Sequence, residues 1–367
     1  MTRIDIDFSL AMHNRTGRFF IGRDLIETPG LPLGDVYYWR LRSPPRGLVR
    51  RVVGRLQRHQ VEGRTLGGRL GWLPPRRPSR SLLHLDPYTV PSTELRRSDI
   101  VLCHDVGPVT HPHLFAPAVG AIYREIYRLV AATGPHMVFV SQASRRGFER
   151  LHPAACPTSS RVIYPAIRTD LSAQMARRPE GIEAPFLLTV GSIGERKNQA
   201  RSIAAFARSG LALRGLRYVL CGAREPGFER VAAAAAQAEG VVLLPYVADA
   251  ELAWLYANAA GFVLASQLEG FAMPVAEAAA HGLVPLVSTG GVLEEVAGDG
   301  ALVADPEDET DIAARMVALA HMATDEKAER QRRLATAVAR FDLARVQAEW
   351  LRAFTEWSGA PSDARFS

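Results

Sequence analysis

Apolar runs alternate with helix-length stretches along the second half of the chain. The runs are apolar at nearly every position and lie at 186–192, 216–222, 241–247, 261–266 and 284–289. Amphipathic or alanine-rich stretches of helical length separate them. Strands that are apolar on both faces and alternate with helices are typical of a parallel, doubly wound sheet. The second half therefore predicts an α/β, Rossmann-like domain.

The first half shows the same alternation less regularly. Strand-like runs lie at 81–90, 98–106 and 136–144, and residues 118–133 have the spacing of an amphipathic helix. A proline- and arginine-rich stretch at 73–80 predicts a loop. These elements predict a second α/β domain in front of the first.

A segment of linker composition separates the two halves, and it defines the predicted domains. We expect a Rossmann-like domain at 1–165, a linker at 166–184 and a second Rossmann-like domain at 185–345. Residues 346–367 are expected to form a C-terminal helix and tail that cross back to the first domain. Two such domains predict a cleft between the carboxyl ends of their strands, where α/β folds bind ligands.

Composition places the protein among ordinary globular proteins, with 47% hydrophobic and 22% charged residues. No apolar run approaches the roughly 20 residues that span a bilayer, and Asp5 and Asp7 interrupt the region where a signal peptide needs an apolar core. The three cysteines are far apart, which predicts buried free thiols and neither a disulfide framework nor a metal motif. We expect a cytoplasmic protein.

Charge is distributed unevenly along the chain. Residues 1–165 carry 24 arginines and 12 acidic residues, a net charge of +12, whereas the whole chain carries +6. The remainder is therefore acidic. Such asymmetry predicts an anionic partner on the N-terminal side.

The excess of arginine is greatest between Tyr37 and Arg80, where Glu62 is the only acidic residue. A helix-like run at 45–60 lies within this stretch. At 100° per residue, a helix here places apolar and basic residues on different arcs. The apolar arc holds Leu48, Val49, Val52, Val53 and Leu56, and the basic arc holds Arg50, Arg51, Arg55 and Arg58.

A basic amphipathic helix of this kind is typical of proteins that lie on an anionic membrane surface. The expected interfacial anchors near it are the aromatic residues Tyr37, Tyr38, Trp39 and Trp72. The alternative is a helix whose apolar arc packs on the sheet of its own domain while the arginines face water.

Two glutamates eight residues apart form the first candidate site. Glu269 ends an apolar strand, Gly270 permits close approach of a ligand to the backbone, and a helix is expected to begin at about Ala272. Glu277 interrupts the apolar pattern of that helix. Amides at a helix start bind anions, and carboxylates accept hydrogen bonds from sugar or ribose hydroxyls. The alternative is that both are ordinary solvated residues.

The second candidate site follows the first apolar run of the second half. Gly191 and Gly194 form a turn, and Arg196 and Lys197 precede a helix that Asn198 opens. Two cations beside the free amides of a helix suit a diphosphate. Neither a P-loop nor a G-x-G-x-x-G motif is present, and a solvated loop is the alternative.

The sequences GSIGERKNQ (191–199) and EGFAMPVAEAAAHGLVPLVSTGGVLEEVAGDGALVADPED (269–308) resemble the donor-binding core of glycosyltransferase family 4. The resemblance implies a GT-B fold, retention of anomeric configuration and no required metal or other cofactor. It implies that Glu277 holds the ribose of a nucleotide sugar, and that Glu269 and the amides of Gly270 and Phe271 contact the transferred sugar.

By the same resemblance, Arg196 and Lys197 hold the diphosphate of the donor. Many family members have an arginine directly after the first glycine of this loop, where this chain has Ser192 after Gly191. We therefore expect Arg196 to provide more of the phosphate contact than in those members.

The N-terminal half resembles the family at three places. Thr16, Gly17 and Arg18 resemble the family's Thr-Gly-x-Gly-Arg loop without its second glycine, which implies a place near the phosphates or the acceptor. His104 and Asp105 follow a strand, where the family has a sugar-contacting histidine. The stretch that contains Ser144 and Arg145 resembles the family's Val-Ser-x-x-Ser segment at the cleft. The alternatives are a core histidine bonded to the backbone and a helix-capping serine.

Two metal-like patterns are set aside. Asp5-Ile6-Asp7 has the Asp-x-Asp form, but it lies in the first predicted strand, where a charged strand end is the better interpretation. His104, Asp105, His111 and His113 lack the spacing of a zinc site because prolines interrupt them. We expect no metal site.

The expected activity is retaining transfer of a hexose from a nucleotide sugar, with mannose from GDP-mannose as the preferred donor. The acceptor is expected to be a saccharide, free or linked to a polyprenyl diphosphate, used in surface polysaccharide or glycolipid synthesis. No nucleic-acid partner is expected. The alternatives are a sugar-nucleotide epimerase of the same fold and an inactive nucleotide-sugar-binding scaffold, which an acceptor-dependent release of nucleoside diphosphate would distinguish from a transferase.

Overall fold

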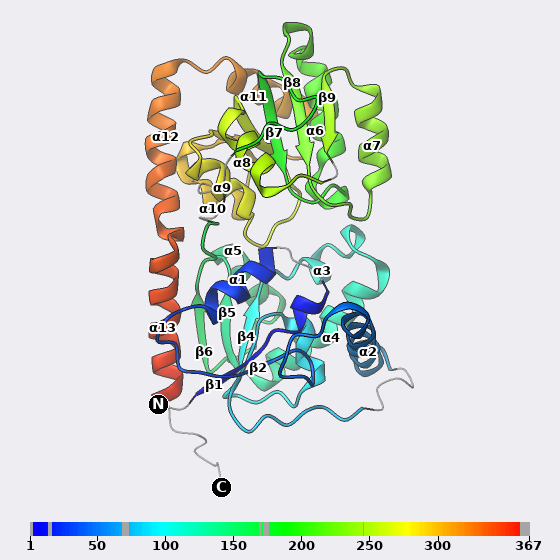
Figure 1. Ribbon diagram of the computed structural model, residues 1–367, viewed down its shortest axis with the longest axis vertical. Coiled ribbons are helices and arrows are strands. Elements are labelled where there is room, and N and C mark those ends of the chain that lie inside the picture. Colours follow the sequence, from blue (N-terminus) through cyan, green and yellow to red (C-terminus); the bar gives the residue numbers. More distant parts are fainter. Residues whose placement is uncertain are drawn as a thin grey trace. The chain divides into compact units, whose positions relative to one another are not determined.

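The chain forms two compact α/β units (Figure 1). The computed structural model describes residues 3–13, 17–67, 73–168, 171, 176–244 and 246–359. Unit 1 consists of Met1–Ala166 together with Leu343–Ser367, and unit 2 consists of Ile167–Asp342. The C-terminal helix therefore belongs to the unit that the N-terminal half forms.

Unit 1 is built on a six-stranded parallel sheet with the strand order β2-β1-β3-β4-β5-β6. Its strands are β1 (Ile4–Asp7), β2 (Leu33–Tyr37), β3 (Leu82–His84), β4 (Ile100–Cys103), β5 (His136–Phe139) and β6 (Ser159–Val162). The run at 81–90 is a strand only as far as His84. Asp86 then accepts a hydrogen bond from the amide of Tyr88, and with Pro87 it starts a 3₁₀ helix, η2 (Pro87–Ser92).

The helices of unit 1 are α1 (Gly17–Ile26), α2 (Gly47–Leu66), α3 (Gly107–Thr110), α4 (Pro117–Thr133), α5 (Gln142–Leu151) and α13 (Leu343–Gly359), with the 3₁₀ helices η1 (Ser9–Met12) and η3 (Pro112–Leu114). Apart from α2, the helices of unit 1 bury apolar residues inside the unit. Helix α4 confirms the helix predicted at 118–133. It buries Ile122, Tyr123, Ile126, Tyr127 and Val130, which recur at helical spacing.

Helix α2 turns most of its predicted apolar arc outward, and its inward face holds two glutamines together with Gly54 and Val61. Gln57 and Gln60 are buried, and Gln60 accepts a hydrogen bond from the indole of Trp39 at 2.7 Å. Leu48 is 69% exposed and Val49 57% exposed. The alternative in which the apolar arc packs on the sheet is therefore wrong.

The same contacts correct the set of expected membrane anchors. Trp39 is buried and bonded to Gln60, so it is not available at a membrane surface. The guanidinium of Arg76 lies 3.6 Å from the ring centroid of Tyr37. Trp72 lies outside the described residues. Tyr38 remains partly exposed beside the start of α2.

Unit 2 confirms the predicted doubly wound parallel sheet. The strand order is β12-β11-β10-β7-β8-β9, and every pairing is parallel. Its strands are β7 (Phe186–Val190), β8 (Arg217–Cys221), β9 (Val241–Leu244), β10 (Gly261–Leu264), β11 (Pro285–Ser288) and β12 (Leu302–Ala304). The apolar pattern predicted the first five strands and missed β12, which has only three residues and pairs at the edge of the sheet.

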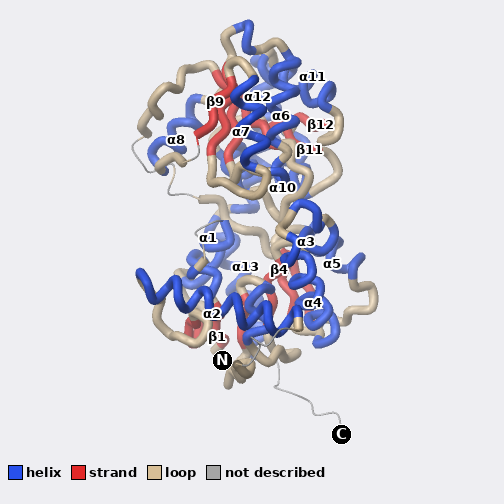
Figure 2. Tube along the Cα trace, turned by 90° about the vertical axis from the view of Figure 1, so that its right-hand side faces the viewer, coloured by secondary structure: helices blue, strands red, loops and turns tan. Residues whose placement is uncertain are grey.

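The helices of unit 2 cover both faces of its sheet. They are α6 (Gln199–Ser209), α7 (Phe228–Gln237), α8 (Asp249–Asn258), α9 (Met273–Ala280), α10 (Val292–Ala297), α11 (Glu309–Ala320) and α12 (Thr324–Val338), with the 3₁₀ helices η4 (Glu195–Lys197), η5 (Ala212–Arg214), η6 (Gly298–Gly300) and η7 (Ala339–Phe341). Helix α6 contacts α7 and α11, and α8 lies on the opposite side of the strands (Figure 2).

Two further expectations about the bulk of the chain can be compared with the structure. Cys103 and Cys221 are buried free thiols, but Cys156 is exposed because it lies in the loop between α5 and β6, so the prediction of three buried thiols is wrong for that residue. Within the described part of the chain, no helix is both long and apolar enough to span a membrane.

Helix α13 is part of the core of unit 1, although it is the last helix of the chain. Phe354 is fully buried and Trp350 is 3% exposed. The indole of Trp357 donates a hydrogen bond to Ser159 in β6 at 3.2 Å, and its ring lies 5.5 Å from that of His136 in β5. These contacts tie the C-terminus to one edge of the first sheet.

We therefore expect Phe354→Ala to destabilise unit 1 by about 3–5 kcal/mol, because it leaves a cavity between α13 and the sheet. Urea unfolding followed by circular dichroism measures the loss. The control is Arg352→Ala, since Arg352 is exposed on the same helix. Equal unfolding midpoints for the two variants would show that α13 contributes little to the core.

Candidate functional site

The strand order of unit 2 changes direction between β7 and β10, which lie side by side at the centre of the sheet. In parallel α/β sheets, ligands bind at the carboxyl ends of the strands at such a switch point. The chain that follows β7 contains Gly191, Arg196 and Lys197, and the chain that follows β10 contains Glu269. Topology therefore places the two candidate motifs of the sequence at one crevice.

A carboxylate holds two cations at this switch point. Lys197 Nζ donates a short hydrogen bond to Glu269 Oε1, and an Arg196 nitrogen lies 3.2 Å from Glu269 Oε2. Ser266 Oγ donates to the same carboxylate at 2.8 Å. The Lys197 and Glu269 side chains are only 7% and 6% exposed. The cluster is thus a largely desolvated group of charges at the point where a ligand is expected.

For both Glu269 and Lys197, burial and the neighbouring charges shift the pKa in opposite directions. Burial alone would raise the pKa of Glu269, but Lys197 and Arg196 outweigh it, so the pKa of this carboxyl is lowered and it is ionised at neutral pH. Burial lowers the pKa of Lys197, although Glu269 opposes that shift. Replacement of Glu269 by a ligand anion would keep both cations paired.

Glu225 is a member of this cluster that the sequence interpretation missed. It lies in the loop after β8, and its carboxylate is 3.3 Å from an Arg196 nitrogen. The signal that would have found it is Gly222, which ends the apolar strand just before. Gly222 has φ +150°, and a Cβ there would lie 2.0 Å from the carbonyl oxygen of Gly191. The loops after β7 and β8 approach so closely that only glycine fits.

Gly191 and Ser192 form the backbone floor beside the cations. Gly191 has φ +141°, and a Cβ there would lie 3.6 Å from Lys197 Nζ. Gln199 donates to the carbonyl of Ser192 at 3.0 Å and accepts from the amide of Gly194 at 2.9 Å. The turn is therefore fixed by the first residue of α6.

Glu277 lies within α9 and is 6% exposed. The hydroxyl of Tyr256, in α8, donates to Glu277 Oε2 at 2.9 Å, and the Tyr256 ring stacks on His281 with centroids 5.1 Å apart. Burial raises the pKa of Tyr256 well above its ordinary value, so its hydroxyl keeps the proton that it donates. Tyr256 therefore orients Glu277, and the sequence interpretation did not include it.

The turn between Glu269 and α9 is held by a buried ring. Phe271 is 5% exposed, and its ring contacts that of Phe341 edge to face with centroids 5.0 Å apart. Ala272 has φ +69°, so α9 begins at Met273, one residue later than expected. The Phe271 contact anchors the backbone of Gly270 and the first turn of α9.

Unit 1 has its own switch point, between β1 and β3. Arg18, in the first turn of α1, pairs with Asp86 after β3 at 2.7 Å and approaches Asp105 after β4 to 3.6 Å. The hydroxyl of Tyr123 donates to Asp86 at 3.1 Å. Gly17 opens α1, so the predicted residues Gly17, Arg18 and Asp105 lie near one edge of this sheet. Asp86 and Tyr123 were not predicted.

His104 is buried and neutral in the same region. Its Nε2 donates to the carbonyl of Leu85 at 2.8 Å, which leaves Nδ1 as the acceptor of the ring. Burial, supported by the nearby Arg18, lowers the pKa of His104 to about 4. The backbone bond weighed as an alternative is thus present, and it orients a ring that can still accept one hydrogen bond.

Ser144 supports the segment that carries His104. Its hydroxyl donates to the carbonyl of His104 at 2.6 Å, while the N-cap of α5 is Ser141, which accepts from the amide of Ser144 at 3.0 Å. The capping role weighed for Ser144 is therefore filled by Ser141. Arg145 is partly exposed and pairs with Glu149 on its own helix at 2.8 Å, so the structure does not join it to this cluster.

The remaining predicted residues lie elsewhere. Thr16 is outside the described residues. The residues of the predicted basic arc of α2 are all exposed, namely Arg50, Arg51, Arg55 and Arg58.

The Asp-x-Asp pattern belongs to the interior of unit 1. Asp5 accepts from the amide of Asp35 at 2.9 Å and pairs with Arg80 at 3.2 Å, and Asp7 accepts from the amide of Ser9 at 3.0 Å. Burial raises the pKa of Asp7 to about 6. The two carboxylates lie in the first strand as expected, and both are buried and bonded within unit 1. The described residues contain no group of three or more histidine, cysteine or acidic side chains that could hold a metal ion.

Part of the chain is similar to known proteins in sequence. Residues 173–338 match the model of the family described as Glycosyl transferases group 1. O-antigen chain mannosyltransferase B of Escherichia coli is 45% identical over 74 residues, which cover 20% of this chain and 19% of that protein. The match thus spans about a fifth of the length of that relative.

Solved structures resemble the chain over nearly its whole length. An α,α-trehalose-phosphate synthase (UDP-forming) from Burkholderia xenovorans, in complex with glucose-6-phosphate, has a TM-score of 0.67 and 13% identity, covering 96% of this chain and 100% of that one. Anabaena HepE, in complex with UDP and glucose, has a TM-score of 0.64 and 14% identity, covering 97% and 100%. At these identities the likeness shows the fold. Residues 173–338 are thus similar to the glycosyl transferases group 1 family, and the two Rossmann-like units of the chain have the GT-B fold.

Proposed function

We propose that the protein is a retaining glycosyltransferase that moves a hexose from a nucleotide sugar to a saccharide acceptor. The observation that carries the proposal is the cluster of Arg196, Lys197 and Glu269 at the switch point of unit 2. It lies within the segment that matches the group 1 family. Two cations held in a desolvated crevice suit a diphosphate leaving group, whose charge grows as the sugar departs.

The proposed roles follow from this geometry. The diphosphate takes the place of Glu269 as the partner of Arg196 and Lys197, and the released Glu269 carboxylate accepts hydrogen bonds from hydroxyls of the transferred sugar. The amides at Gly270 and Phe271 contribute to the same end of the donor. Glu277, oriented by Tyr256, accepts from the ribose hydroxyls.

The transfer step needs no protein nucleophile. The bond between the anomeric carbon and the β-phosphate oxygen breaks, and the acceptor hydroxyl attacks the same face of the sugar. The departing β-phosphate takes the proton of that hydroxyl. The protein contributes by holding the reactants and by stabilising the diphosphate. In unit 1, neutral His104 and the Arg18–Asp86 pair offer an acceptor and donors to sugar hydroxyls.

The proposed donor is GDP-mannose. Its support is the 45% identity over 74 residues to a protein named as a mannosyltransferase. The similar solved structures include one in complex with UDP and glucose, so UDP-glucose is the alternative donor. A local sequence match at 45% identity carries more weight for the donor than a fold match at 14%.

We expect Glu277→Gln to weaken binding of GDP-mannose about 10- to 100-fold, because a neutral amide accepts ribose hydrogen bonds less strongly than a carboxylate. Glutamine keeps an oxygen for the Tyr256 hydroxyl, so the melting temperature should change little. Calorimetric titration with GDP-mannose and with UDP-glucose measures the affinities, and a melting curve measures the stability. The control is Glu229→Gln on the exposed surface of α7. Unchanged affinity would remove Glu277 from the site, and tighter binding of UDP-glucose by the native protein would replace the proposed donor.

We expect transfer to continue in excess EDTA, because Arg196 and Lys197 provide the positive charge that a divalent cation provides in metal-dependent transferases. Release of nucleoside diphosphate in the presence of acceptor measures the rate. Loss of turnover in EDTA, restored by magnesium or manganese, would contradict a metal-independent mechanism. Release without acceptor would instead indicate hydrolysis and no transfer.

The acceptor is proposed to be lipid-linked, with the protein at the inner face of the cytoplasmic membrane. Helix α2 supports this because its apolar arc is exposed, with Val52 at 49% and Leu56 at 44%. Arg51, Arg55 and Arg58 flank that arc and are exposed as well. An exposed apolar stripe beside arginines is typical of a helix that lies in an anionic bilayer surface. The acceptor of this proposal is a saccharide on a polyprenyl diphosphate.

We expect the variant Arg51→Gln, Arg55→Gln, Arg58→Gln to lose most of its sedimentation with phosphatidylglycerol vesicles at low salt. Each arginine near such a surface contributes about 1 kcal/mol, so three removals predict roughly a 100-fold loss. The matched control replaces the same residues by lysine and should sediment almost as the native protein does. Donor affinity should be the same in all three proteins. A native protein that does not bind these vesicles at low salt would contradict the membrane proposal.

A further inference from the structure

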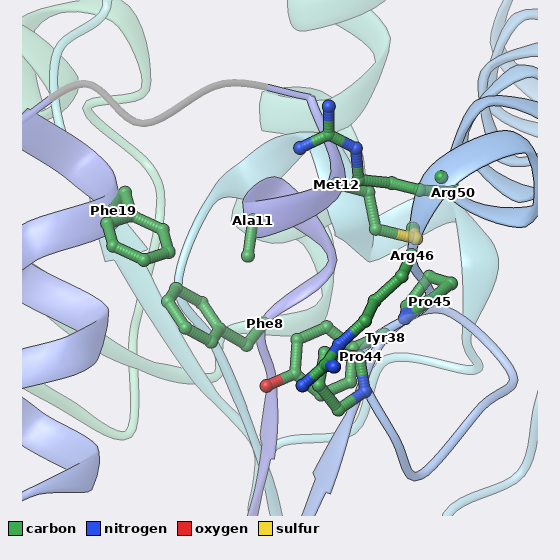
Figure 3. A pocket seen from close by; sticks show the side chains of 10 residues that line it. Phe8, Ala11, Met12, Phe19, Tyr38, Pro44, Pro45, Arg46 and Arg50 are labelled. Atoms are coloured by element: carbon green, nitrogen blue, oxygen red, sulfur yellow. The ribbon is translucent and has the colours of Figure 1, made fainter.

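A pocket of about 370 Å³ opens in unit 1 beside the first turn of α2 (Figure 3). It is lined by Phe8 after β1, Tyr38 after β2, residues of η1 and α1, and the segment that leads into the first turn of α2. None of the residues assigned above to donor binding or transfer lines it. The pocket is therefore separate from the residues proposed to bind the donor and to transfer the sugar.

The inner wall of the pocket is apolar and aromatic. The ring of Phe8 lies between those of Phe19 and Tyr38, with centroids 5.4 Å and 6.0 Å away (Figure 3). Phe8 and Met12 are 5% and 6% exposed, so they are fixed parts of the core that end at the pocket surface. A fixed apolar wall of this kind suits a hydrocarbon and not a free sugar.

The rim of the pocket is cationic. Arg46 is the N-cap of α2 and Arg50 follows one turn later, and both are exposed. The first turn of α2 contains no acidic residue, and no side chain caps it. Helix starts usually carry acidic or capping side chains because the amides there are positive. Two arginines at this position therefore favour an anion at the mouth of an apolar pocket.

The pocket also adjoins both surfaces that the proposed function uses. Leu48 and Val49, in the same first turn of α2, begin the exposed apolar arc. Phe19 is the neighbour of Arg18, which pairs with Asp86 at the switch point of unit 1. A ligand in the pocket would thus lie next to the expected membrane surface and on the helix that carries part of the sugar-side cluster.

We propose that this pocket binds the phosphate-proximal hydrocarbon of a single-chain isoprenyl phosphate lipid, with Arg46 and Arg50 on the phosphate. The proposal rests on the lipid-linked acceptor proposed above and names its site on this chain. A volume of about 370 Å³ is at the low end of the range of about 300–1,000 Å³ for ligand pockets, which suits one chain and not the two of a diacyl phospholipid.

The test uses geranyl monophosphate in solution, titrated calorimetrically without vesicles. The native protein should bind it, and Ala11→Leu should weaken binding at least 10-fold because Ala11 lines the pocket and leucine fills it. The matched control is Ala132→Leu, an exposed position on α4. The double variant Arg46→Gln, Arg50→Gln leaves the pocket open and should also weaken binding at least 10-fold. Because both arginines are exposed, this variant tests the proposal even if Ala11→Leu does not fold.

Three results would overturn the proposal. The first is no binding of geranyl monophosphate, and the second is equal binding of inorganic phosphate, which would leave only an anion site. The third is equal or tighter binding of a soluble short-chain diacyl phosphatidate, which would assign the pocket to membrane phospholipid. Failure here is distinguishable from failure of the proposed function. The vesicle assay uses Arg51, Arg55 and Arg58, which do not line the pocket, and donor binding uses unit 2.

Discussion

Parallel pairing of every strand is the constraint on which the rest of the structure depends. A parallel connection must return the chain across the sheet, so the carboxyl ends of all strands in a unit meet at one edge. The loops at that edge carry most of the polar residues of the candidate sites, because the central strands are buried on both faces. Where the strand order reverses, two such loops diverge. In unit 2 these are the loops after β7 and β10, and in unit 1 those after β1 and β3.

Each switch point holds buried charges, and each set is compensated internally. Arg196 and Lys197 share Glu269 in unit 2, and Arg18 pairs with Asp86 in unit 1. A desolvated charge is costly unless it is paired, so the members of each cluster hold one another in place even without a ligand. The consequence for function is preorganisation: the groups that are proposed to meet a diphosphate are already fixed before it binds.

Helix α2 differs from these clusters, because its exposed apolar arc contributes no burial of apolar surface to the stability of the isolated chain. It is attached to unit 1 through Val61, which is fully buried in the hydrophobic core, and through the hydrogen bonds of Gln60 to Trp39 and to the carbonyl of Leu73. Leucine and valine side chains left in water are a cost that a helix buried by its apolar face avoids. The pocket lined by Phe8 and Arg50 lies at the start of the same helix. The apolar, anionic partner proposed for this surface would cover both features.

The sequence by itself determined the α/β class, the doubly wound sheet of the second half and the two motifs around Lys197 and Glu269. Such features are local, since strand patterns and glycine turns depend on neighbouring residues. Tertiary structure alone decided that Glu225 and Tyr256 join those motifs, because they come from other loops and helices that are distant along the chain. It also decided which arc of α2 is buried. Periodicity reveals that a helix has two faces, but the partners available to each face, here the indole of Trp39, select the one that turns inward.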